Sequence, residues 1–306
     1  MCGILGSVGK INIKRFSNSL KLIKHRGPDK TNILVRENIF FGHQRLQIID
    51  LNERSDQPMY SKNKNYLLTY NGEIFNYLNL KKKLMQEGVI FETTSDTEVL
   101  LKSYEFWGKD CIKKFEGMFA FAIYDFKKKE LVVARDRSGI KPLYYSFKSG
   151  NFIFSSEVDP IVNLLDKVTL NPKSINSFLS FRYVINNETF LNEIKELPPG
   201  KVLLFKNKRI KIKSYWSLKI KSNNSLSEEE ISYELNDKVN KSVKNHLISD
   251  VPVASFLSGG LDSSVITYEA SKLSNYKINS FVIKLESGDR SDSDHAKLLA
   301  KKFNTN

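Results

Sequence analysis

The strongest constraint on the fold of this 306-residue sequence is a change of hydrophobic pattern after about residue 205. Up to that point, short runs rich in β-branched and aromatic residues have the spacing of antiparallel strands. The predicted strands are Ile33–Val35, Ile39–Gly42, Tyr66–Tyr70, Ala120–Tyr124, Leu131–Ala134, Leu143–Ser146, Phe152–Ser155 and Val202–Phe205. Helices are predicted at Phe16–Lys24 and Asp96–Trp107, the second opened by a capping box of Ser95 and Glu98. We therefore expect an α+β domain of antiparallel sheet with flanking helices.

The second part of the chain has the pattern of a parallel βαβ unit. Residues 206–226 are polar, as in an edge strand that runs into a linker. A capping box of Ser227 and Glu230 then opens a helix whose apolar residues recur every fourth position, at Ile231, Leu235, Val239, Val243 and Leu247. A strand, a helix, a strand and a helix follow at Val251–Leu257, Ser263–Leu273, Asn279–Leu285 and Ser293–Phe303. We predict a first domain at 1–210, a linker at 211–227 and the beginning of an α/β parallel-sheet domain at 228–306.

Composition narrows the class of protein. No apolar run is long enough to cross a membrane, and the start MCGILGSVGK lacks the layout of a secretory signal. Two cysteines, Cys2 and Cys111, form no disulfide framework, so we expect a reducing, cytoplasmic location. The net charge of +14 is compatible with a nucleic-acid binder. Because the lysines form short groups among asparagines, a solvated surface without a nucleic-acid partner is the better interpretation.

Cys2 is the first candidate for chemistry, because it directly follows the initiator methionine. Removal of Met1 would leave a thiol and a free α-amine on one residue. An α-amine has a pKa of about 7.7 to 8.0, so much of it can accept the thiol proton at neutral pH. A cysteine at this position is more often incidental, and the catalytic interpretation therefore depends on other residues.

A thiol that attacks a carboxamide requires donors for the oxyanion, an anion for the substrate ammonium and a cation for its carboxylate. A turn after the strand that ends at Tyr70 could direct the Asn71 amide and the Gly72 N–H at one point, although Asn-Gly is also ordinary hairpin chemistry. Arg45 could bind a carboxylate through two hydrogen bonds, or be a surface arginine that is solvated or paired with an acid. Asp96 could bind an ammonium, or serve only the helix that it begins.

Nine stretches resemble, in order, the class II glutamine amidotransferases, which use an N-terminal nucleophile. They are MCGI, HRGPD (His25–Asp29), GHQRLQIIDL (Gly42–Leu51), YNGEIFNY (Tyr70–Tyr77), SDTEVLL (Ser95–Leu101), FEGMFAFAIYD (Phe115–Asp125), ARDRSGIKPLYY (Ala134–Tyr145), FSSEV (Phe154–Val158) and LPPG (Leu197–Gly200). The resemblance implies a four-layer αββα fold, with Cys2 as the nucleophile and Asn71 and Gly72 as the oxyanion hole. It also implies that glutamine is bound by Arg45, Glu73 and Asp96.

A second candidate site is the stretch SGGLDSS, which lies between a predicted strand and a predicted helix. Backbone N–H groups in such a turn bind phosphate, and the Asp262 carboxylate could orient Mg²⁺, although a Gly-Gly turn can also be merely structural. The stretch resembles the PP-loop of ATP-pyrophosphatases, and it lacks the lysine of a kinase-like P-loop. The resemblance implies ATP contacts at Leu257, Ser258, Gly259, Gly260, Asp262, Ser263, Ser264 and Ile283. Lys284 stands where that family usually has glycine.

Together the two resemblances indicate the asparagine synthetase family, which takes glutamine, aspartate and ATP with Mg²⁺ and makes asparagine. The synthetase domain of that family is longer than the stretch present, so we expect this chain alone to act only as a glutaminase. A homodimer, or a second chain that carries the rest of the domain, is then expected. The alternatives are an amidotransferase of the same architecture that acts on a sugar-acid or peptide carboxylate, and a non-catalytic or nucleic-acid-binding module.

Overall fold

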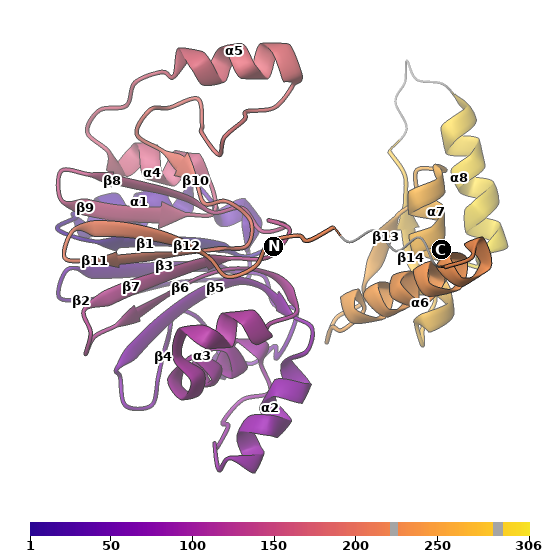
Figure 1. Ribbon diagram of the computed structural model, residues 1–306, viewed down its shortest axis with the longest axis horizontal. Helices are drawn as coiled ribbons and strands as arrows, with labels where there is room; N and C mark the ends of the chain where they lie inside the picture. The colour runs from indigo at the N-terminus through magenta and orange to yellow at the C-terminus, as the bar shows by residue number, and fades with distance from the viewer. Residues whose placement is uncertain (221–225, 284–289) are drawn as a thin grey trace. The chain divides into compact units, whose positions relative to one another are not determined.

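The computed structural model describes residues 1–220, 226–283 and 290–306, with no side-chain detail at 290–292 (Figure 1). These residues form two compact units, Met1–Leu218 and Lys219–Asn306. In the described residues no helix is long and apolar enough to cross a membrane.

The first unit contains two six-stranded antiparallel sheets. The first sheet has the order β10-β8-β9-β1-β3-β2, with β1 at Gly3–Val8, β2 at Lys30–Arg36, β3 at Ile39–Arg45, β8 at Tyr144–Lys148, β9 at Asn151–Ser155 and β10 at Lys195–Glu196. The second has the order β12-β11-β7-β6-β5-β4, with β4 at Met59–Tyr60, β5 at Tyr66–Ile74, β6 at Gly117–Asp125, β7 at Glu130–Arg135, β11 at Lys201–Lys206 and β12 at Arg209–Ser214. All eight predicted strands overlap these elements, and β12 is the predicted polar edge strand.

Helices cover the outer faces of the two sheets. Helices α1 (Ile13–Lys21) and α4 (Val158–Leu164) share a buried apolar cluster with residues of β1, β3 and β9. Helix α3 (Asp96–Trp107) contacts β5, and α2 (Tyr77–Gln86) contacts α3. Helix α5 (Pro172–Phe181) and the short 3₁₀ helices Lys24–Arg26, Glu53–Ser55 and Gly108–Lys114 complete the unit. The order helix, sheet, sheet, helix is the αββα arrangement that the family resemblance implies (Figure 1).

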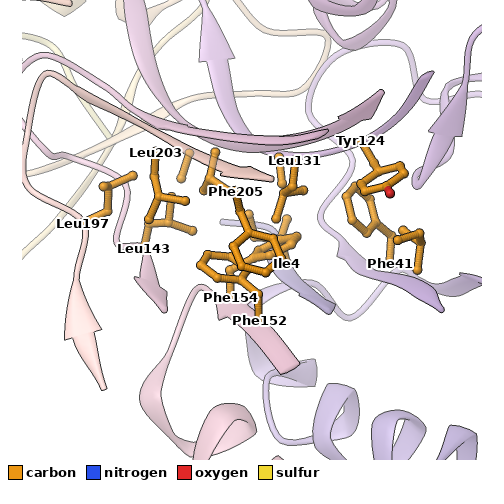
Figure 2. Close-up of a cluster of buried hydrophobic side chains, with 14 of the residues drawn as sticks. Ile4, Phe41, Tyr124, Leu131, Leu143, Phe152, Phe154, Leu197, Leu203 and Phe205 are labelled. Atoms are coloured by element: carbon orange, nitrogen blue, oxygen red, sulfur yellow. The ribbon is translucent and has the colours of Figure 1, made fainter. Parts of the chain in front are cut away.

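The core of the first unit lies between the two sheets (Figure 2). Strand β1 shows how the sequence produces it, because Ile4 packs in this core while its neighbour Leu5 packs against the helices. Across the gap, Phe152 of β9 stacks on Phe205 of β11 with ring centroids 4.7 Å apart. Each such buried side chain contributes roughly 1.5–3 kcal/mol relative to an exposed one, so the sandwich holds the strands that form the site in place.

Two local predictions about this unit are corrected. Helix α1 begins at Ile13, earlier than predicted, because the side chain of Asn12 accepts hydrogen bonds from two backbone N–H groups of its first turn. The capping box predicted at Ser95 and Glu98 is only half formed. Ser95 Oγ accepts from the Glu98 N–H, whereas the Glu98 carboxylate accepts from the N–H groups of Glu92 and Thr93.

The predicted turn at Asn71 and Gly72 is wrong, because both residues lie inside β5 and pair with Ala120 and Phe119 of β6. Gly72 is required there for a different reason than a turn. A Cβ at this position would overlap the carbonyl oxygen of Met118. The close approach of two strands, and not a change of chain direction, therefore explains the glycine.

The second unit contains the predicted βαβ pattern. Its elements are α6 (Glu228–His246), β13 (Ala254–Phe256), α7 (Leu261–Leu273), β14 (Asn279–Phe281) and α8 (Arg290–Lys302). Strands β13 and β14 pair in parallel, and the predicted capping box opens α6 with both of its hydrogen bonds. The end of the second predicted strand, at 284–285, lies outside the described residues.

The apolar stripe predicted on α6 is buried only in its second half. Val243 is buried and packs with Ala270 and Ile278, with Val239 and Leu247 alongside. In contrast, Ile231 and Leu235 are 50% and 60% exposed. The described elements of this unit cover one end of the helix and leave the other end without a packing partner.

Candidate active site

A pocket of about 250 Å³ opens in the first unit at the start of β1 and beside β5. All six residues predicted for the glutaminase site line it: Cys2, Arg45, Asn71, Gly72, Glu73 and Asp96. They come from the residue before β1, from β3 and β5, and from the first turn of α3, so only the folded sandwich brings them together.

Cys2 is fixed at the edge of the pocket through its sulfur and its backbone. The Leu46 N–H donates to Cys2 Sγ at 3.4 Å, and Sγ lies 3.5 Å from the Leu46 carbonyl oxygen. Arg26 Nε donates to the Cys2 carbonyl at 3.2 Å, and Arg26 Nη1 donates to Glu157 at 2.8 Å. Burial raises the pKa of the Cys2 thiol, whereas the Leu46 N–H and the nearby positive charges lower this pKa.

Arg26 contacts Cys2, although the sequence suggested no role for it. The HRGPD stretch in which it lies was the available signal, but nothing in the sequence placed it against Cys2. The Glu157 carboxylate that orients it also accepts from His25 Nε2 at 2.8 Å. These contacts link Cys2 to residues far away in the sequence.

Asn71 carries an unpaired donor into the pocket. Its side chain is 1% exposed, and its Nδ2 has no hydrogen-bond partner in the described part of the chain. The backbone before it is held on both sides, since the Tyr70 N–H donates to Gln57 Oε1 at 2.7 Å and the Tyr70 carbonyl accepts from His43 Nε2 at 3.1 Å. A buried donor without a partner costs roughly 1–3 kcal/mol, and it is available to an oxyanion that enters the pocket.

Arg45 is 4% exposed and is held by a loop of the chain. Its Nη1 donates to Asp56 Oδ1 at 2.6 Å and to the Asn52 carbonyl at 2.9 Å, while Nη2 donates to the Asp50 carbonyl at 2.5 Å. Arg45 is thus not solvated but paired with an acid, Asp56, so the structure excludes only the solvated form of the simpler interpretation. A guanidinium fixed in this way offers a directed positive charge to a carboxylate.

Two carboxylates with raised pKa values face the same pocket. Burial raises the pKa of Asp96 to about 6, although Asp96 Oδ2 accepts hydrogen bonds from the Tyr70 hydroxyl at 2.8 Å and the Ile74 N–H at 3.1 Å. Burial raises the pKa of Glu73 to about 7, and the charge of Asp96 adds to this increase. A buried and a half-buried carboxylate in one pocket form an electrostatic site for a cation such as an ammonium group.

The turn predicted to bind phosphate lies between β13 and α7. Gly259 has a φ of +88°, which favours glycine, and a Cβ on Gly260 would meet only Ser258 Oγ, at 3.6 Å. Ser258 Oγ and Ser263 Oγ lie 3.0 Å apart, and Ser264 Oγ donates to the Gly260 carbonyl at 2.7 Å. The N-terminus of a thirteen-residue helix and several hydroxyl groups thus surround an open space, which fits a phosphate group.

The remaining residues predicted to contact ATP differ in their burial. Leu257 is 2% exposed, and its N–H donates to the Phe281 carbonyl of β14 at 2.8 Å. Asp262 is exposed, and Ile283, two residues after β14, is 79% exposed. Across the described ranges, no group of three or more His, Cys, Asp or Glu side chains is arranged to hold a metal ion. A single carboxylate at Asp262 is consistent with Mg²⁺ that is held mainly by phosphate oxygens.

The first unit therefore has a four-layer αββα fold, with Cys2 lining its pocket. A solved structure of glutamine phosphoribosylpyrophosphate amidotransferase from Bacillus subtilis has the same fold, with a TM-score of 0.53 at 19% identity over 95% of this chain and 68% of that chain. The chain belongs to the glutamine amidotransferase domain family, which matches residues 1–216. The asparagine synthase family matches residues 234–306.

The relatives are considerably longer than this chain. Asparagine synthetase (glutamine-hydrolysing) 1 of Bacillus subtilis (strain 168) is 34% identical over 98% of this chain and 48% of that protein. Amidase chyE of Penicillium rubens is 33% identical over 83% of this chain and 38% of that protein. The chain spans about half the length of the asparagine synthetases from B. subtilis that it matches.

Proposed function

We propose that the first unit hydrolyses glutamine with Cys2 as the nucleophile. One observation carries the proposal: the six predicted residues line a single pocket in which Asn71 Nδ2 is buried without a hydrogen-bond partner. The pocket has a thiol, a fixed guanidinium and two carboxylates, which together match the carboxamide, the carboxylate and the ammonium of glutamine.

In the proposed reaction, Cys2 Sγ attacks the side-chain amide carbon of glutamine and forms a C–S bond. Asn71 Nδ2 and the Gly72 N–H donate to the oxyanion of the tetrahedral intermediate. The C–N bond then breaks, the nitrogen takes up the thiol proton and leaves as ammonia, and a γ-glutamyl thioester remains. Water hydrolyses the thioester, releases glutamate and restores the thiol.

The base for this reaction is proposed to be the α-amine of Cys2, which Met1 removal would expose. In the structure Met1 lines the same pocket, so its removal would expose the Cys2 amine beside the pocket. Burial lowers the pKa of the Met1 amine, and the same effect on a Cys2 amine would favour its proton-accepting form.

We further propose that the second unit contributes to an ATP-dependent amidation of aspartate to asparagine. The open turn at Ser258–Ser264 supports this assignment, because a nucleotide phosphate would accept hydrogen bonds there, with Mg²⁺ near Asp262. ATP supplies the energy to activate a carboxylate. The residues of this chain would hold the nucleotide, with Leu257 beneath the turn and Ile283 toward the base.

Asparagine formation is proposed to require more polypeptide than these 306 residues, because the asparagine synthetases of the comparison are about twice as long. A second chain would supply the remaining segment. A homodimer, the other expected assembly, would not add it. The predicted boundaries at residues 210 and 228, the cytoplasmic location and the absence of a nucleic-acid partner remain predictions.

The first experiment measures glutamate release from glutamine by the 306-residue protein and by Cys2→Ala. We expect loss of at least about 10⁴-fold in kcat, while Cys111→Ala, which replaces the buried second cysteine, keeps its activity. Intact mass after treatment with a glutamine-like electrophile should show one adduct on a protein that lacks Met1. Full activity of Cys2→Ala, or of a protein that retains Met1, would refute the proposal.

A second candidate function is amidation of a different carboxylate. The similarity to Amidase chyE favours it, because a protein with a different name matches the same part of the chain at a comparable identity. Supplying a complementary synthetase segment and comparing aspartate with sugar-acid and peptide acceptors would separate the two. Asparagine as the sole amidated product would exclude this alternative.

A further inference from the structure

The glutaminase pocket contains one more charged residue, Lys141, to which no role has yet been given. It is 5% exposed and lines the pocket together with Cys2 and Glu73. In the described part of the chain, no Asp or Glu side chain forms an ion pair with its ammonium group, that is, none lies within 4.0 Å of it. Burial of a charge without a close partner is unfavourable, so this position requires an explanation.

The backbone at Lys141 is anchored from two directions. The Asp136 carboxylate accepts hydrogen bonds from the N–H groups of Ser138, Ile140 and Lys141 at 2.9 to 3.0 Å. Arg135 Nε donates to the Lys141 carbonyl at 2.8 Å. A loop fixed on both the N–H and the carbonyl side of one residue holds that side chain at the pocket, instead of leaving it free to reach solvent.

The charges that face Lys141 are of both signs. Glu73, Cys2 and Asp136 raise its pKa, whereas burial, which has the largest effect, and the Arg26 guanidinium lower it. In return, Lys141 lowers the pKa of Glu73, which burial raises to about 7, and it also lowers the pKa of the Cys2 thiol. The α-amine at Met1 acts on Glu73 in the same direction. Lys141 therefore opposes the effect of burial on two groups of the site.

We propose that Lys141 is a positioning residue of the glutaminase site, whose fixed positive charge keeps Glu73 ionised to receive the α-ammonium of glutamine and favours the thiolate of Cys2. This inference rests on the proposed glutaminase function. Lys141 acts through the two groups and does not itself bond to the reacting atoms. The charge explains why the fold holds an ammonium group in a buried place.

The test is the pH dependence of the glutamine KM in Lys141→Met, which keeps the length of the side chain and removes the charge. Loss of the charge raises the pKa of Glu73, so Glu73 is protonated up to a higher pH. For a shift of about one pH unit, KM should rise about tenfold at pH 6, about fivefold at pH 7 and by less than about twofold at pH 8.5. A purely structural defect would raise KM by the same factor at every pH.

Three variants control this experiment. Lys141→Arg retains the charge and should restore the wild-type pH profile. Lys128→Met removes a lysine whose side chain is 63% exposed, and it should leave KM unchanged at every pH. In a Glu73→Gln background, Lys141→Met should produce no further pH-dependent change in KM, because Lys141 affects KM through the ionisation of Glu73.

A second measurement does not depend on turnover. The rate of Cys2 alkylation by iodoacetamide should fall about two- to tenfold at pH 7 in Lys141→Met and recover in Lys141→Arg. If Lys141→Met fails to fold by circular dichroism, Lys141→Gln takes its place in both assays. A KM ratio that is constant with pH, together with an unchanged alkylation rate, would overturn the inference. A wild-type protein that releases no glutamate would instead refute the proposed function. The alkylation rates would still test whether the charge of Lys141 affects the Cys2 thiol.

Discussion

The two compact units differ in how completely their apolar faces are covered. In the first unit, both sheets lie between packed layers, and side chains as large as Phe41 and Phe154 are fully buried. In the second, the parallel pair β13–β14 leaves Phe256 and Phe281 exposed by 74% and 56%. Parallel strands normally have both faces covered. The comparison indicates that the first unit contains its own core and that the second requires further polypeptide.

The two candidate sites also differ in how deeply their residues are buried and in what holds them in position. In the first unit, Asn71, Arg45 and Asp96 are at most 5% exposed, and backbone groups and side chains fix them in position. In the second, Ser258 and Asp262 lie on an exposed turn whose hydroxyl groups bond to one another. A packed scaffold is what holds polar groups in a productive arrangement. The first site is thus organised before a substrate arrives, and the second presents only part of a site.

The most severe test of this comparison is to separate the two units. Residues 1–218 alone should unfold cooperatively and keep kcat/KM for glutamine within about twofold of the longer chain, because their core is self-contained. Residues 219–306 alone should show no cooperative thermal transition, since their buried cluster is small. Calorimetry and glutamate release measure these outcomes. A sharp transition in the shorter piece would refute the contrast.

The next largest effect is expected at Asn71. Asn71→Ala should reduce kcat about 10²- to 10³-fold but change the free energy of unfolding by about 1 kcal/mol or less, because Nδ2 has no partner to lose. Asn240→Ala in the second unit is the control. Its Nδ2 donates to Glu269 at 2.9 Å, so glutaminase activity should not change. Steady-state kinetics and thermal melts would reveal the opposite pattern if Asn71 were only structural.

A pair of glycine substitutions compares the packing of the two sites. Gly72→Ala should cost about 3 kcal/mol in the free energy of unfolding, because its Cβ would meet Phe119 Cα at 2.7 Å as well as the Met118 carbonyl oxygen. Gly260→Ala should cost less than about 1 kcal/mol, since the space beside it is open and its φ is −72°. Denaturant titration followed by circular dichroism measures both. Equal costs would mean that the strand at Gly72 and the turn at Gly260 are packed alike.

The smallest effect is expected from Tyr70→Phe, which removes the hydroxyl group that donates to Asp96. This hydrogen bond lowers the pKa of Asp96, and burial holds that pKa at about 6. Without the hydroxyl, Asp96 is protonated up to a higher pH and binds an ammonium less well. The glutamine KM should rise about threefold near pH 6.5 and return to the wild-type value by pH 8.5. A rise that persists at high pH would indicate lost packing instead.

Local patterns in the sequence were sufficient for much of the architecture. The alternation of apolar residues predicted strands within β2, β3, β5, β6, β7, β8, β9 and β11, and the bounds of α3 are those predicted. The parallel βαβ order of the second unit was also predicted, because strands separated by a helix pair in parallel. These features depend on neighbours in the sequence, which is why the sequence alone revealed them.

Features that depend on distant residues were missed or misread. Asn71-Gly72 has the chemistry of a turn, yet pairing with β6 keeps it in a strand. Ile231 and Leu235 continue the apolar repeat of α6, but no described element covers them. Lys141 has the residue type of an exposed surface position, and only the hydrogen bonds of Asp136 and Arg135 bring it to the pocket. Each outcome required the folded partners.

The sequence by itself determined the order of strands and helices, the resemblance that singled out Cys2, and the set of residues expected to bind glutamine. The tertiary structure decided which of their atoms are buried, paired or left free. It also added Lys141 to the pocket and placed Arg26 against the carbonyl of Cys2. The physical reason is the range of the interactions. Propensity and periodicity act over a few residues, whereas burial and electrostatics depend on groups brought together from across the chain.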